Sequence, residues 1–195
     1  NGCIKIKSPA TGANYLTEVT MGASVNHSHL FYDVLWINSG IAVTTTTAQA
    51  ITTPTLPARD VNGTTNGEGL MIGLMWTAAS TNAGAISTST VSYTNSAGTS
   101  GRTATLFALA GAQIPITPVI GTIVWFNLAA GDTGVRSIES ITLATSLATG
   151  SVSLFIARDL ANIGTAVVNV QTSRYLGEAG TGLYTGTCML HAVLA

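Results

Sequence analysis

Charged residues are scarce in this sequence. Lys and Arg number 7 and Asp and Glu number 8 among 195 residues. That is 8% of the chain, where an ordinary soluble domain has about 25%. For a folded chain of this length, size scaling gives roughly 8,600 Å² of accessible surface, or about 570 Å² for each charged residue. Because so bare a surface is a solubility liability for a free monomer, the composition predicts that copies of the chain or partner proteins cover much of it.

Two further absences exclude classes of partner. The mean hydropathy is +0.43, but no apolar run reaches the length of about 18 residues that a membrane-spanning helix needs. We therefore expect no membrane association. The only lysines are Lys5 and Lys7, and the net charge is −1. Since no basic stripe can neutralise a phosphate backbone, we expect no nucleic-acid binding.

Cysteine is also rare, and the only two, Cys3 and Cys188, lie near opposite ends of the chain. Two cysteines do not make a disulfide framework. They could join the termini, because sandwich folds often bring the first and last strands together. Two buried apolar thiols are the favoured interpretation.

The sequence has few groups from which to build a catalytic or metal site. It contains no nucleophile elbow, phosphate loop, dinucleotide fingerprint or Cys-x-x-Cys pair, so we expect neither an enzyme nor a cofactor. His27, His29 and His191 could supply three nitrogens to zinc, and residues 60–68 carry oxygen side chains of the kind that bind calcium. Polar histidines at a strand start and a hydrogen-bonded Asx-rich turn are the favoured alternatives, and we expect no metal.

Small residues that tolerate β-structure dominate the chain, which has 31 Thr and 21 Gly. No long window shows helical spacing of apolar residues, so the sequence predicts an all-β protein. Alternation within 138–143 and 152–156 indicates strands with one face packed inward. The expected strands are 3–7, 29–37, 50–55, 70–78, 86–94, 103–108, 122–128, 137–145, 151–157, 166–170 and 187–194.

The turn spacing and the absence of βαβ alternation favour an antiparallel β-sandwich, specifically a jelly roll. We expect one sandwich domain at 29–195, preceded by an N-terminal arm at 1–28. That arm either extends to a neighbouring subunit or is a loose terminus. Loops 57–69, 94–102 and 129–136 are expected to form a polar rim or a solvent-facing tip.

A few side chains are the best candidates for specific contacts between subunits. Trp36, Trp76 and Trp125 lie among aliphatic residues and are expected to be core or interface anchors. In a chain with so few charges, opposite charges close in sequence are candidates for ion pairs that fix a loop or a subunit contact. The predicted interface residues are Lys5 and Lys7 in the arm, Arg59 with Asp60, and Asp132 with Arg136.

Three stretches, at 53–63, 91–103 and 129–138, resemble a family of virion proteins from tailed double-stranded DNA bacteriophages. The most distinctive parts are Tyr-Thr-Asn-Ser-Ala-Gly-Thr at 93–99 and Gly-Asp-Thr-Gly-Val-Arg-Ser at 131–137. The resemblance covers roughly residues 29 to 160 and supplies no catalytic residue. It implies a structural part of the phage particle, assembled in the host cytoplasm.

The expected function is non-enzymatic: a capsid decoration or cement protein, or another component of the head surface. Its partners would be copies of itself and other virion proteins such as the major capsid protein. One alternative is a structural component of the neck or tail. Another is a carbohydrate-binding module for host adhesion, in which Tyr175 and Tyr184 would stack on a glycan.

Overall fold

A computed structural model of the chain describes residues 3–5, 18–22, 24, 27–83, 86–107, 117–165, 170–175 and 188–194. The described chain is all-β and antiparallel, as the sequence predicts. In these ranges the only helical turn is a 3₁₀ turn, η1, and none of their helices is long and apolar enough to cross a membrane. The elements are β1 (Cys3–Lys5), β2 (Glu18–Met21), β3 (His27–Asn38), β4 (Gln49–Ala50), β5 (Leu70–Ala78), η1 (Ile86–Thr88), β6 (Thr90–Asn95), β7 (Arg102–Leu106), β8 (Ile123–Asn127), β9 (Val135–Thr142), β10 (Ser151–Thr165), β11 (Thr172–Tyr175) and β12 (Cys188–Leu194).

The chain divides into two compact units. Leu35–Ala157 forms the central unit, and Asn1–Val34 with Arg158–Ala195 forms the terminal unit. Both boundaries fall inside strands, β3 and β10, where the sequence has no linker signal. The division therefore differs from the expected boundary between residues 28 and 29.

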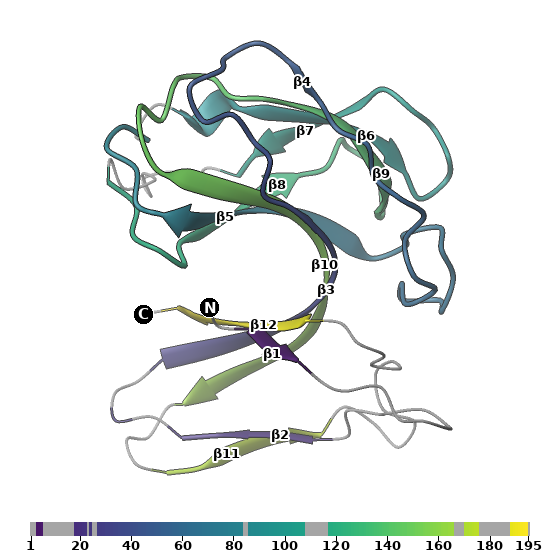
Figure 1. Cartoon of the computed structure of the whole chain (residues 1–195). Helices are drawn as coiled ribbons and strands as arrows, with labels where there is room; N and C mark the ends of the chain where they lie inside the picture. The colour runs from purple at the N-terminus through teal and green to yellow at the C-terminus, as the bar shows by residue number, and fades with distance from the viewer. Residues whose placement is uncertain are drawn as a thin grey trace. The chain divides into compact units, whose positions relative to one another are not determined.

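The central unit is β-sandwich-like. Its strands follow the hydrogen-bonded order β3-β10-β5-β8-β7-β6-β9-β4. This sheet curls, so that β5 and β10 form one layer of the unit and β4, β6 and β9 form the other (Figure 1). Such curling follows from the twist that neighbouring strands accumulate across a wide sheet.

The core of the central unit lies between these layers. Trp76 on β5, Val91 and Tyr93 on β6, and Ile156 on β10 are fully buried in it. The Trp76 indole Nε1 donates to Ser80 Oγ at 2.9 Å, which satisfies the ring's one polar group inside the core. Trp76 is therefore a core anchor, and Trp36 packs against the same cluster with partial exposure.

Strand β9 does not follow a simple alternation. Its buried residues Val135, Ile138 and Ile141 are three apart. The pairing of β9 with β6 skips Arg136 and Glu139, which marks two β-bulges. A bulge adds one residue and re-aims the neighbouring side chains, so the period of two expected at 138–143 is wrong.

Strand β10 is buried on both faces in the central unit, although we expected one polar face. All residues from Val152 to Ile156, including Ser153, are at most 1% exposed. The Phe155 ring meets Trp125 of β8 edge to face, with ring centroids 5.3 Å apart. This aromatic contact covers the face that the alternation had assigned to small polar groups, because Phe155 lies on the same face as Ser153.

In the terminal unit the strand order is β1-β12-β3-β10, and β2 pairs with β11. Phe31, Leu160 and Ile163 pack with Val19 of β2 in a separate apolar cluster. Two segments of the expected arm thus pair within their own chain, as β1 and β2. Whether the arm reaches a neighbouring subunit stays a prediction.

Candidate functional site

Three loops of the central unit meet and are joined by backbone hydrogen bonds. They are residues 59–69, 95–101 and 129–136, which we call the loop cluster. The Val135 N–H donates to Gly67 O at 2.9 Å, and the Ser96 N–H donates to Gly134 O at 3.1 Å. The loops expected as a polar rim are therefore one connected structure.

Asp60 organises the first loop from inside. Its carboxylate, on a residue only 1% exposed, accepts backbone N–H groups from Asn62, Thr64, Gly67 and Glu68 and also the Thr64 hydroxyl. Burial alone would raise the pKa of Asp60, but these donors, Thr64 first, lower it below its ordinary value. Because the carboxylate oxygens face these protein donors, this loop forms the hydrogen-bonded Asx turn that the sequence favoured.

Gly67 lets the first loop touch strand β9. It has a φ of +83°, and an added Cβ would lie 1.9 Å from Val135 O. Only glycine tolerates both this left-handed backbone and this approach. The loop can therefore close on β9 only if position 67 has no side chain.

Asp132 is the centre of a second network. Its Oδ2 accepts Arg102 Nε at 2.9 Å and also the Tyr93 hydroxyl, while its Oδ1 accepts Asn95 Nδ2 at 2.8 Å. The hydrogen bond from Arg102, followed by that from Tyr93, lowers the pKa of Asp132 to about 2. Asp132 therefore pairs with Arg102, and the predicted pairing with Arg136 is wrong.

Glu139, at one of the β9 bulges, ties that strand to β6 and to the second loop. Its carboxylate accepts the hydroxyls of Ser92 at 2.6 Å and Thr94 at 2.9 Å, and the Gly101 N–H at 3.1 Å. The Ser92 hydrogen bond outweighs burial and lowers the pKa of Glu139. Asp60, Asp132 and Glu139 are thus all held ionised, which suits loop fixation and not proton donation near neutral pH.

Arg136, at the other bulge, joins two loops through neutral acceptors. Its Nη2 donates to Asn66 Oδ1 at 2.9 Å and to Ser96 O at 2.8 Å. Within the described chain no carboxylate lies within salt-bridge distance of this guanidinium, and its buried Nε has no hydrogen-bond partner. Within these residues its positive charge is therefore not neutralised by an ion pair.

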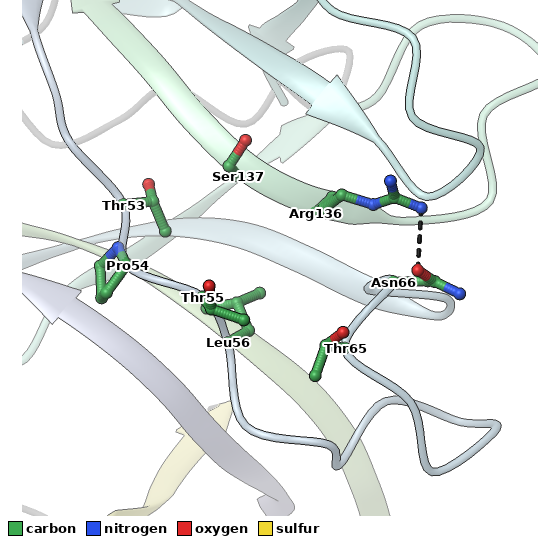
Figure 2. A pocket seen from close by; sticks show the side chains of 8 residues that line it. All are labelled: Thr53, Pro54, Thr55, Leu56, Thr65, Asn66, Arg136 and Ser137. Carbon is green, nitrogen blue, oxygen red and sulfur yellow. Dashed lines mark hydrogen bonds between the residues drawn. The ribbon is translucent and has the colours of Figure 1, made fainter.

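Beside Arg136 the surface is hollowed. Figure 2 shows Arg136 and Asn66 at one side of this hollow, opposite the segment from Thr53 to Leu56. Its volume is about 220 Å³. The lining residues are Thr53, Pro54, Thr55, Leu56, Thr65, Asn66, Arg136 and Ser137.

Charge in the central unit is confined to this region. The unit contains seven charged residues, and each lies in the loop cluster, at the start of β7 or at the Glu139 bulge of β9. Residues 69–101 and 103–131 contain none. The seven are Arg59, Asp60, Glu68, Arg102, Asp132, Arg136 and Glu139.

Comparison with protein-family profiles, with well-described proteins and with solved structures finds no match to this chain. In the part that the structure describes, no group of three or more His, Cys, Asp or Glu residues is placed to hold a metal ion. The pairing of β12 with β3 sets His191 opposite Phe31 and Val193 opposite His29. His29 is buried, and the side chains of His27 and His191 lie outside the described part.

The structure describes some of the other predicted site residues. Arg59 is buried at 5% exposure, and Lys5 lies in β1 opposite Cys188 of β12. Tyr175 lies in β11 opposite Glu18. The side chains of Lys5 and Tyr175, and the whole of Lys7 and Tyr184, lie outside the described residues.

The sequence reasoning missed several residues that hold the loop cluster. Arg102, Tyr93 and Asn95 surround Asp132, yet none of these three was a candidate. One signal was available, because Arg102 is one of only three arginines between residues 35 and 157. A cation that rare in the sequence should have been considered as a partner for Asp132.

Proposed function

We propose that this chain is a non-enzymatic structural protein of a tailed bacteriophage particle, which acts by assembling with copies of itself and with other virion proteins. The resemblance in residues 53–63, 91–103 and 129–138 suggests that the chain is part of such a particle. These stretches supply much of the loop cluster, including Asp60, Asp132 and Arg136.

The observation that carries this proposal is the segregation of charge in the central unit. A unit of this length would ordinarily have about 30 charged residues, and its seven are gathered at the loop cluster. Arg59 and Asp60 are buried as well, and Asp132 is paired internally. The rest of the unit's surface has no charged side chain to keep it dispersed in water.

The uncharged region also exposes large apolar side chains. Phe107 is 41% exposed, Val119 68% and Ile120 64%. The Gly121 N–H donates to Trp76 O, and the Phe107 N–H donates to Trp125 O. Phe107, Val119 and Ile120 therefore lie where β5 and β7 end and β8 begins. Because β5 and β7 start at the loop cluster, this apolar end lies away from the charged one.

Contact with another protein subunit is more favourable for this apolar end than contact with water. Stable interfaces bury about 1,600 Å² in total and exclude charge from their centre. An exposed apolar group in a region without charged residues meets that requirement. The charged loop cluster would then face solvent or form the polar rim.

Sedimentation equilibrium of the full chain at about 10 µM tests the proposal. We expect a defined oligomer, or co-sedimentation with heads of the phage that encodes the chain. Val119→Glu should disrupt that association by placing a charge in the interface. Val61→Glu is the matched control, because Val61 is 62% exposed in the loop cluster and its substitution should leave association unchanged.

A monomer that binds no heads would overturn the proposal. An equal effect of the two substitutions would overturn the assignment of the apolar end as the contact surface. Circular dichroism of both variants separates loss of association from loss of folding.

A further inference from the structure

The hollow beside Arg136 has the lining of a small polar binding site. It opens where the chain leaves strand β4 and runs past the edge of β9. Thr53 ends the pairing there, since its hydroxyl both donates to Ile138 O at 3.0 Å and accepts the Ile138 N–H at 2.9 Å. Beyond this point Arg136 and Ser137 of β9 line the hollow (Figure 2).

Three hydroxyl groups around the hollow are free to bind a ligand. In the described chain, Thr55, Thr65 and Ser137 make no side-chain hydrogen bond, whereas Thr53 is occupied by Ile138. Each hydroxyl can both donate and accept. Together they match a ligand that itself carries several hydroxyl groups.

The only charge in the lining of the hollow is positive. Arg136 is the only charged residue among the eight that line the hollow, and its acceptors, Asn66 Oδ1 and Ser96 O, are neutral. Arg102, by contrast, already has its carboxylate in Asp132. A guanidinium without an acid partner favours a carboxylate. Nη1 is the group that would donate to it, because Nη2 already donates to two acceptors and Nε is buried.

The volume of the hollow and the side chains that line it restrict the class of ligand further. A volume of about 220 Å³ is below the range of about 300–1,000 Å³ typical of larger small-molecule sites. The lining has no aromatic ring on which a neutral sugar would stack. The ligand is therefore small, hydroxylated and acidic.

We propose that this hollow binds an acidic sugar residue, such as a uronic acid, through its carboxylate at Arg136 and its hydroxyl groups at Thr55, Thr65 and Ser137. This site is separate from the apolar end at Phe107, Val119 and Ile120. It goes beyond the assembly proposal and does not depend on it. It also differs from the glycan contact expected at Tyr175 and Tyr184.

Ligand-observed NMR titration of the full chain with D-glucuronate tests this assignment. We expect saturable binding with a dissociation constant on the order of 1–10 mM. D-Glucose, which lacks the carboxylate, and acetate, which lacks the hydroxyls, should each bind at least about tenfold more weakly. Binding should weaken as salt is added, because salt screens the attraction to the guanidinium.

Substitutions assign the binding to the hollow. Arg136→Gln should weaken glucuronate binding at least about tenfold. Since Arg136 also joins two loops, Thr55→Val provides a second test that removes one free hydroxyl and keeps the shape of the side chain. It should weaken binding about threefold or more, whereas Thr47→Val, at an exposed threonine outside the hollow, should not.

Absence of glucuronate binding at concentrations well above about 10 mM would overturn the proposal. Equal binding of glucose and glucuronate, or binding that is unchanged in the Arg136→Gln and Thr55→Val variants, would also overturn it. None of these outcomes bears on self-association, which the sedimentation experiment measures separately.

Discussion

Arg102 Nε donates to Asp132 Oδ2 at 2.9 Å, across 30 positions of sequence. The pair joins the first residue of β7 to the loop that follows β8, and Tyr93 and Asn95 of β6 donate to the same carboxylate. Arg136, only four positions from Asp132, turns instead to Asn66 and Ser96. The connection between loops is thus set by the sheet and not by proximity along the chain.

Removing the Tyr93 hydroxyl tests the network around Asp132. That hydroxyl donates to Asp132 and accepts the Ala129 N–H at 3.0 Å. Tyr93→Phe should lower the free energy of unfolding by about 1–3 kcal/mol, because it leaves partly buried partners unsatisfied. Asp132→Asn should also be destabilising, and the double variant should lose less than the sum of the two single losses.

Urea denaturation at fixed protein concentration measures these effects. Glu18→Gln, at an exposed carboxylate of β2, is the control and should change stability by less than about 0.5 kcal/mol. Strictly additive losses would show that Tyr93 and Asp132 act independently.

Acid should destabilise the protein through three carboxylates. The pKa of Asp132 falls from 3.8 to about 2 in the folded chain, and those of Asp60 and Glu139 are also lowered. Folding therefore stabilises the ionised forms, and this contribution is complete above about pH 5. It should be lost progressively as the pH falls from about 4.5 towards 2.

Urea denaturation across this pH range gives the measurement. The Asp132→Asn variant should show a shallower loss of stability than the unmodified chain. Stability that is independent of pH between about 5 and 2 would contradict the lowered pKa values.

Two glycines of the first loop provide a matched comparison. Gly67 and Gly63 both have positive φ, +83° and +71°, but a Cβ at Gly67 would overlap Val135 O, whereas one at Gly63 meets nothing within 4 Å. Gly63→Ala should cost about 1–2 kcal/mol from backbone strain alone. Gly67→Ala should cost clearly more, because the loop must also move off β9.

Thermal unfolding of the two alanine variants compares these costs directly. Equal melting temperatures would mean that the first loop is not held against β9 as the structure shows.

Substitution of Thr53 tests how the backbone of β9 is hydrogen-bonded at its edge. Its hydroxyl satisfies both backbone groups of Ile138, so Thr53→Val should leave a donor and an acceptor unpaired and cost about 1–3 kcal/mol. Thr55→Val removes a hydroxyl with no such role and should be nearly neutral for stability. Hydrogen exchange at the Ile138 amide should rise in the first variant only.

Much of the fold could be predicted from local patterns. The strand at Leu70–Ala78 has the predicted limits, since a long apolar run between turn residues has few alternatives. The strand expected at 86–94 was predicted to begin too early. Ile86 is buried at the 3₁₀ turn η1, and in the sequence a buried apolar residue at this point looks like the start of a strand. The strand at Glu18–Met21 was missed, because its stabilising partner, β11, lies about 150 residues away.

The sequence by itself determined that this protein is all-β, poor in charge and rich in polar loops, since composition and short-range periodicity settle those properties. Only the tertiary structure decided which charges meet. The two bulges of β9 re-aim Arg136 and Glu139, and the sheet brings Arg102 to Asp132. A bulge arises from the register between strands distant in sequence, so no local pattern contains it.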